Sequence, residues 1–176
     1  MADIHPARQG EINKALKKLM ENPSVPKELK DKLGYRYDQP KWEQISLDEI
    51  KPHLGILGEN ERKRILFTIL MQASTMKAVE IMRRETWDLQ ELAPEINYQH
   101  ELLRDLYDVS LPELERIRDA MLKAGALAVK LSGAGLGGSL VALVESDEEE
   151  IIKSALLAGA KQAWKVRPDE GARIEQ

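Results

Sequence analysis

The sequence predicts an α+β fold in which helices pack on one face of an antiparallel four-stranded sheet. Residues 60–85 contain neither glycine nor proline and repeat apolar residues at helical spacing, which predicts one long helix. Residues 127–131 and 140–144 are apolar segments of strand length. The segment Gly133–Gly138 between them is too short for a parallel crossover, so the two strands should pair antiparallel.

The length and composition are those of one globular domain. The chain has 176 residues, of which 43% are hydrophobic and 32% charged, enough to close a single core. We therefore expect one domain over residues 1–176, with residues 1–50 as a helical and irregular lead-in. The net charge of -4 argues against a chain built mainly to coat nucleic acid or an anionic membrane.

The sequence also bounds the chemistry and the cellular location. It contains no cysteine, which excludes disulfide scaffolds, thiolate zinc sites and cysteine nucleophiles. No signal peptide and no run of about 18 consecutive apolar residues is present. We therefore expect a cytoplasmic protein with no nucleic-acid and no membrane partner. Formation of a homo-oligomer remains possible from the sequence.

The N-terminal half is expected to be helical with one irregular crossing. Apolar residues on one face predict a helix over residues 11–20. Residues 34–41 are polar and aromatic and end at a proline-containing stretch, which indicates an irregular segment. Ser46 and Glu49 form a capping-box pattern and predict a short helix. The long helix that follows should be packed on both flanks, and residues 95–107 predict another helix.

The C-terminal third begins with a helix and two strands. Ser110 and Glu113 form a second capping box, and Gly125 should end that helix in the left-handed conformation. Residues 127–131 alternate in character, which predicts a half-buried strand. The continuous apolar run at residues 140–144 predicts a fully buried strand.

A further helix and up to two strands should complete the fold. Ser146 and Glu149 form a third capping box, and Gly159 should end the helix that they open. Residues 164–167 alternate apolar and basic side chains and predict a third strand. Residues 171–174 are the candidate fourth strand.

A cluster of glycines separates the first two strands. Four of the 11 glycines fall within Ser132-Gly133-Ala134-Gly135-Leu136-Gly137-Gly138-Ser139. Without side chains, a ligand or a second backbone can approach closely, and successive N–H groups can form an anion-binding nest. A glycine-rich hairpin between closely packed backbones is one interpretation. A dinucleotide fingerprint G-x-G-x-x-G is another, but a strand rather than a helix should follow it, and only 38 residues remain after Gly138.

The third interpretation comes from a resemblance. The segment KLSGAGLGGS at residues 130–139 resembles the third conserved motif of the GHMP kinases, which include galactokinase, homoserine kinase, mevalonate kinase and phosphomevalonate kinase. The segments GENER at 58–62, HELLRDLYDVS at 100–110 and PDEGAR at 168–173 are similar to galactokinase segments. Archaeal mevalonate kinases share part of this pattern, so the branch stays open. The resemblance implies the ferredoxin-like C-terminal domain of this superfamily.

The resemblance also implies a function for the chain. In this family the nucleotide-binding loop, roughly Pro-x-x-x-Gly-Leu-x-Ser-Ser-Ala, and the catalytic Asp and Lys lie in an N-terminal domain, and no similar segment occurs here. The chain therefore resembles the C-terminal half of a sugar kinase that uses ATP and Mg²⁺, with an N-terminal domain or subunit as its partner and a small-molecule substrate. Residues Ser132–Ser139 would close the phosphate and substrate site through backbone donors. The chain alone should bind no cofactor and supply no catalytic residue.

Two departures and two alternatives accompany this interpretation. Ser139 stands where the family motif commonly ends in Cys, and Leu136 replaces a frequent Gly or Phe; a loop whose backbone makes the contacts tolerates both. The alternatives are a half-enzyme of the mevalonate kinase type and a non-catalytic binding or regulatory module that keeps the fold.

Four other features of the sequence are candidate sites or charged surfaces. Lys130 and His100 are candidates to face the cleft between the two domains, although Lys130 could be structural and a lone histidine is more often a surface or buried hydrogen-bonding residue. Residues 62–64 are interpreted as a solvated helix start. The acidic run at residues 148–150 should stabilise a helix start rather than bind a metal, so no metal site is predicted.

Overall fold

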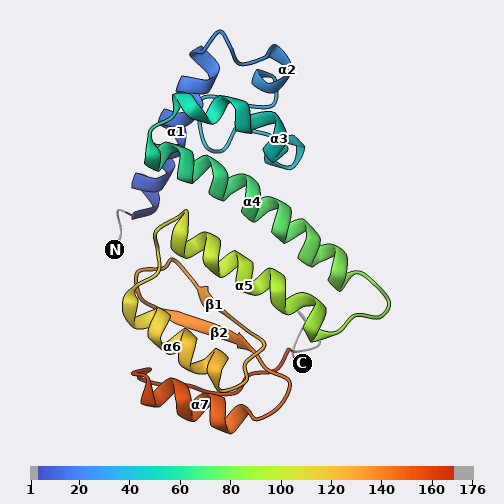
Figure 1. The fold of residues 1–176 in the computed structure, drawn as a ribbon, viewed down its shortest axis with the longest axis vertical. Coiled ribbons are helices and arrows are strands. Elements are labelled where there is room, and N and C mark those ends of the chain that lie inside the picture. Colours follow the sequence, from blue (N-terminus) through green and yellow to red (C-terminus); the bar gives the residue numbers. More distant parts are fainter. Residues whose placement is uncertain (1–3, 169–176) are drawn as a thin grey trace, which may run out of the picture.

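The computed structural model describes residues 4–168, which form two parts stacked along the long axis of the molecule (Figure 1). The helices are α1 (Ile4–Glu21), α2 (Lys27–Lys30), α3 (Leu47–Ile50), α4 (Glu59–Met82), α5 (Leu89–Asp105), α6 (Pro112–Lys123) and α7 (Glu148–Leu157). Two 3-10 turns, Trp42–Gln44 and Lys51–Ile56, flank α3. Helices α1 to α4 form one part, and helices α5 to α7 surround the strands in the other.

The sheet consists of two antiparallel strands, β1 (Ala128–Ser132) and β2 (Ser139–Leu143). The register places Val129 opposite Ala142 and Lys130 opposite Val141. This confirms the predicted antiparallel pairing across the short glycine loop. The face that carries Val129 and Ala142 packs against apolar residues of α6 and α7, and α5 lies against β1.

The prediction of a four-stranded sheet is wrong for residues 4–168, which contain only the two strands above. Residues 164–167 are irregular, and their alternation buries no face: Trp164 and Val166 are 70% and 78% exposed. Lys165 forms an ion pair with Glu148 instead. The candidate fourth strand at residues 171–174 lies outside the described residues. The protein is therefore a mainly helical α+β domain.

Several helix ends lie where the capping residues in the sequence predict them. Ser46 and Glu49 make the predicted capping box at α3. Gly125 and Gly159 follow α6 and α7 with φ of +107° and +110°, as expected for left-handed helix ends. Helix α5 begins at Leu89, six residues before its predicted start at 95, because Asp88 accepts a hydrogen bond from the Glu91 N–H at 2.8 Å.

Three other local predictions are wrong. Helix α6 is preceded by Leu111 at its N-cap, because the Ser110 hydroxyl donates to the Glu115 carboxylate rather than capping the helix. Helix α7 is preceded by Asp147 with φ of +59°, not capped by Ser146. Strand β2 is not fully buried, since Val141 is 54% exposed. Within the described residues, no element covers the face of β2 that carries Val141, so this strand is buried on one face only.

Two apolar clusters form the core. The larger joins α1, α2, α3 and the first half of α4, with Leu16, Leu19, Ile50 and Ile65 almost completely buried. The smaller lies between the sheet and helices α6 and α7, and it is centred on Val129. The glycine loop and its surroundings lie on the sheet side of the boundary between the two parts.

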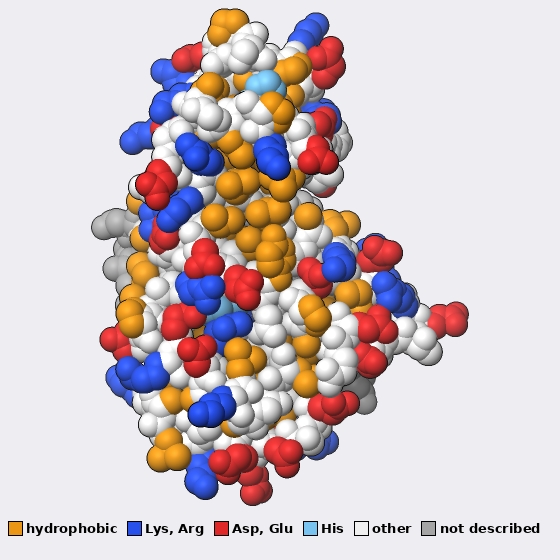
Figure 2. All heavy atoms as spheres, in the orientation of Figure 1, with side chains coloured by type: hydrophobic (Ala, Val, Ile, Leu, Met, Phe, Trp, Pro, Cys, Tyr) orange, Lys and Arg blue, Asp and Glu red, His pale blue; other side chains and the backbone are white. Residues whose placement is uncertain are grey.

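Helix α4 joins the two parts. It contacts α1 on one flank and α5 on another, as its broad apolar surface predicts. By length and composition alone it is long and apolar enough to cross a membrane, with a mean hydropathy of 1.4 and 28% of that window buried. Core helices of globular proteins pass the same test. Figure 2 shows hydrophobic side chains gathered over the middle of the molecule, in the region where α4 runs.

Candidate functional site

The loop between β1 and β2 has an unusual backbone. Residues Gly133, Gly135, Leu136, Gly137 and Gly138 have φ of +88°, +83°, +53°, +125° and +88°. The left-handed region costs an L-residue roughly 1–2 kcal/mol, whereas glycine enters it freely. The glycines are therefore required by the path of the chain, and Leu136 is the one loop residue with a side chain that adopts a positive φ.

The loop contacts Val109, which lies in the connection between α5 and α6, at residues 106–111. The Leu136 N–H donates to the Val109 carbonyl oxygen at 2.7 Å. A Cβ added to Gly135 would lie 2.6 Å from the Val109 Cβ and 2.8 Å from its carbonyl oxygen. Val109 itself is 1% exposed. The close backbone approach expected for a glycine-rich segment therefore occurs here between the loop and Val109.

Apart from Leu136, the loop residues 133–138 make no backbone hydrogen bond through their N–H groups within the described part of the chain. Gly133, Ala134 and Gly138 are exposed. A Cβ at Gly133 or Gly137 would meet no atom within 4 Å. Unpaired N–H groups on an open, side-chain-free surface are the donors that an anion-binding nest uses.

The dinucleotide interpretation does not fit this geometry. In that motif the glycines open a helix whose N-terminus faces the pyrophosphate. Here strand β2 begins at Ser139, directly after Gly138. The spacing of Gly133, Gly135 and Gly138 is therefore coincidental.

Lys130 lies beside a shallow hollow. Strand alternation places it on the sheet face opposite the one that packs on α6, where it lines a cavity of about 290 Å³ together with Gln99, Ser132 and Val141. Its ammonium group donates to Gln99 Oε1 at 2.8 Å. Burial lowers the pKa of Lys130, because the charged form loses solvation. Lys130 thus links α5 to β1 and borders an open space.

His100 lies in the interior, between α5, β1 and α6, and is 0% exposed. Its Nδ1 accepts the Leu131 N–H at 3.1 Å, so the neutral ring carries its proton on Nε2, which donates to Glu115 Oε1 at 2.8 Å. Burial lowers the pKa of His100, and the Glu115 carboxylate opposes this shift without cancelling it. His100 does not line the hollow beside Lys130.

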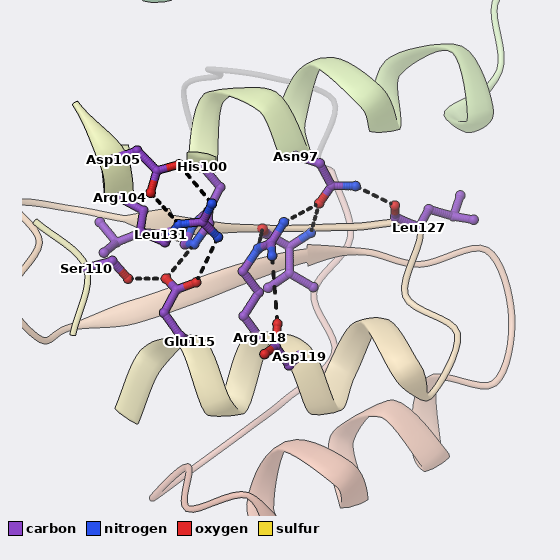
Figure 3. A network of polar contacts seen from close by, with 11 residues as sticks. Asn97, His100, Arg104, Asp105, Ser110, Glu115, Arg118, Asp119, Leu127 and Leu131 are labelled. Atoms are coloured by element: carbon purple, nitrogen blue, oxygen red, sulfur yellow. Dashed lines mark hydrogen bonds and ion pairs between the residues drawn. The ribbon is translucent and has the colours of Figure 1, made fainter. Parts of the chain in front are cut away.

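His100 belongs to a polar network along the outer edge of β1 (Figure 3). Asn97 accepts the Val129 N–H at 3.2 Å and donates to the Leu127 carbonyl at 3.0 Å. Arg118 donates to the Val129 carbonyl at 3.0 Å. These side chains pair backbone groups that a neighbouring strand would otherwise satisfy. Sequence reasoning missed Asn97, Arg118 and Glu115; the three-residue spacing of Asn97 and His100 on one helix face was the available signal.

A second network lies at the start of α4. The interpretation of residues 62–64 as solvated is wrong for Arg64, which is 0% exposed. Its guanidinium donates to Glu11 Oε2 at 2.6 Å, to Asp108 Oδ2 at 2.7 Å and to the Leu106 carbonyl. A buried guanidinium is tolerated only when its donors are paired in this way.

The acidic run does not form a metal site in the described part of the chain. Residues 148–150 occupy the first turn of α7, where carboxylates favour the helix dipole. Within residues 4–168, no group of three or more His, Asp or Glu side chains is arranged to hold a metal ion.

A family model and curated proteins that are similar to this chain point to the same family. The family model described as GHMP kinases C terminal matches residues 70–162. A galactokinase from Lactobacillus helveticus is 31% identical over 147 residues, which cover 83% of this chain and 34% of the relative. A galactokinase from Pyrococcus furiosus is 28% identical over 138 residues, which cover 74% of this chain and 39% of the relative.

A solved structure shows the same fold. The crystal structure of Lactococcus lactis galactokinase complexed with galactose matches 88% of this chain and 37% of its own, with a TM-score of 0.70 and 23% identity. The chain therefore spans about a third of the length of the relatives that it matches.

Proposed function

Because the chain belongs to the family of GHMP kinase C-terminal domains, we propose that it is the C-terminal half of an ATP-dependent sugar kinase of the galactokinase type. The glycine loop carries the proposal: its unpaired amides lie on an open surface, held in place at Val109. The identities of 28% to 31% with galactokinases favour this branch of the family.

The loop suits charge neutralisation rather than covalent chemistry. Phosphoryl transfer depends mainly on positioning and on stabilising charge on the phosphoryl oxygens. The N–H groups of Gly133, Ala134, Gly137 and Gly138 would donate to these oxygens without a side chain in the way. Mg-ATP would supply the transferred group and the cation that offsets its charge. Lys130 is engaged with Gln99, so its role would be to orient β1 against α5.

The other wall of the site would come from a partner. The family resemblance places the nucleotide-binding loop and the catalytic Asp and Lys in an N-terminal domain, and the relatives are about three times as long as their match to this chain. We therefore propose an N-terminal GHMP kinase domain or subunit as partner, with ATP and Mg²⁺ bound in the complete enzyme.

Reconstitution tests this proposal. The chain would be mixed with a polypeptide that bears the Pro-x-x-x-Gly-Leu-x-Ser-Ser-Ala motif, and phosphorylation of galactose would be followed with Mg-ATP. Activity should require both polypeptides. Phosphorylation of mevalonate instead of galactose would move the assignment to that branch. A stable complex with no activity on either compound would favour a non-catalytic module.

Matched variants connect the activity to the loop. Gly137 and Gly125 have φ of +125° and +107°, and a Cβ at either would meet no atom within 4 Å. Gly137→Ala should lower kcat/KM for Mg-ATP, whereas Gly125→Ala, at the end of α6, should change stability alone. In isothermal titration the isolated chain should bind Mg-ATP weakly or not at all. Tight binding would contradict a site shared between two polypeptides.

A further inference from the structure

The connection between α5 and α6, residues 106–111, packs against the glycine loop. Val109 makes both contacts with the loop: its carbonyl accepts the Leu136 N–H, and its side chain lies against Gly135. Asp108, the preceding residue, has φ of +52°, a left-handed conformation that is uncommon for a residue with a side chain, although Asp and Asn adopt it more readily than most. Such a conformation persists only where the surrounding contacts hold it.

Those contacts converge on Asp108 from α1 and α4. Arg64 Nη2 donates to Asp108 Oδ2 at 2.7 Å, and Lys63 Nζ lies 3.6 Å from Asp108 Oδ1. Arg8 Nη2 donates to the Asp108 backbone carbonyl at 3.4 Å. Arg64 also donates to the carbonyl of Leu106, so it holds the turn at two points.

The buried position of Arg64 makes it the organising member of this group. Arg64 is fully buried, whereas the side chains of Lys63 and Asp108 are 33% and 38% exposed. Its Nε donates to Glu11 on α1, so each of its three nitrogens has a partner. A planar guanidinium with a partner on each of its three nitrogens holds those partners in one geometry, which a flexible surface pair does not.

The far side of the same connection is held independently. The Ser110 hydroxyl donates to Glu115, which is bonded to His100, and His100 accepts the Leu131 N–H of β1. The turn at residues 106–110 is therefore held by Arg64 on one side and by the β1-edge network on the other. The glycine loop lies on the residue between these two anchors.

From this geometry we infer that Arg64 is a positioning residue for the glycine loop: its contacts with Asp108 and Leu106 hold the left-handed turn that places the Val109 carbonyl beneath Leu136. The consequence for phosphate binding rests on the proposed function, whereas the positioning is a property of the isolated chain.

Site-resolved amide hydrogen exchange on the isolated chain tests the inference. Arg64→Met should accelerate exchange of the Leu136 amide by about 10- to 100-fold, the range expected when a charge-assisted hydrogen bond that holds its acceptor is lost. The matched control is Arg118→Met. Arg118 is also buried and also donates to a backbone carbonyl, but its acceptor is Val129 on the edge of β1. That variant should loosen β1 and leave Leu136 protected relative to the strand.

A second variant removes the partner charge instead of the buried arginine. Asp108→Asn retains a residue that tolerates positive φ and sits at a partly exposed position, so the chain should remain folded. It should accelerate Leu136 exchange in the same direction, while the slowest core amides keep their rates. If Asp108→Asn leaves Leu136 protected, or if Arg64→Met and Arg118→Met affect the loop equally, the inference is overturned. Neither result depends on kinase activity, so failure of the proposed function would be recognised separately by the reconstitution assay.

Discussion

Replacing Gly135 with alanine should cost more stability than the same change two residues earlier. Gly135 and Gly133 have nearly the same φ, +83° and +88°. At either position alanine pays the left-handed penalty of roughly 1–2 kcal/mol. A Cβ at Gly133 would meet nothing within 4 Å, whereas a Cβ at Gly135 would lie 2.6 Å from the Val109 Cβ. This makes Gly133→Ala a control for the backbone cost alone.

The additional cost at Gly135 is that of overpacking. Forcing a methyl group into a filled site costs typically about 1–3 kcal/mol. Gly135→Ala should therefore lower the free energy of unfolding by about 2–5 kcal/mol in total, against about 1–2 kcal/mol for Gly133→Ala. For a chain of this size, each kcal/mol corresponds to about 2–4 °C in Tm.

Equilibrium urea unfolding of both variants and the wild type measures the difference directly. The reasoning is refuted if the two variants have equal stability within about 0.5 kcal/mol, the ordinary scatter for surface changes. Equal stability would mean that the loop moves off Val109 at no cost. In that case the Leu136 amide would exchange rapidly in Gly135→Ala, which identifies the cause.

Three further predictions concern the buried polar groups. Burial lowers the folded-state pKa of His100, so the unfolded chain binds more protons and stability should fall as pH drops below about 6.5. His100→Gln should flatten a plot of urea midpoint against pH below that value. Asn97→Leu should lower the free energy of unfolding by about 1–3 kcal/mol, because it leaves the Val129 N–H buried without its acceptor; far-UV circular dichroism during urea unfolding would detect this. Glu95→Gln should cost about 1–3 kcal/mol by the same measurement, since Glu95 is buried and bonded to Ser74, whereas Lys77→Met should cost under about 1 kcal/mol because the Lys77 side chain is 66% exposed.

The features that the sequence predicted correctly are those decided by neighbouring residues. Gly125 and Gly159 end their helices because a left-handed residue is needed at a fixed offset from the last turn. Ser46 and Glu49 cap α3 through contacts three residues apart. The antiparallel pairing of β1 and β2 follows from the short connection between them.

The features that it missed depend on residues far apart in the chain. Ser110 has the local signal of a cap, but its hydroxyl is taken by Glu115 within a network that includes His100. Arg64 lies in the polar first turns of α4, where the sequence predicts exposure. It is buried because its guanidinium pairs with Glu11, 53 residues away, and with Asp108, 44 residues away. No periodicity in the sequence encodes such partners.

The glycines of the loop have separable roles. Contact with Val109 explains the absence of a side chain at Gly135, but no packing contact explains it at Gly133 or Gly137. The backbone at those two positions requires φ of +88° and +125°, well beyond the +53° that Leu136 adopts. Gly135 therefore allows the loop to contact Val109, and the other glycines allow the backbone to adopt the positive φ values that the loop requires. The proposed anion site would use the N–H groups of these other loop residues as its donors. Close packing on Val109 therefore accounts for the glycine at 135, and the backbone conformation accounts for the glycines at 133 and 137.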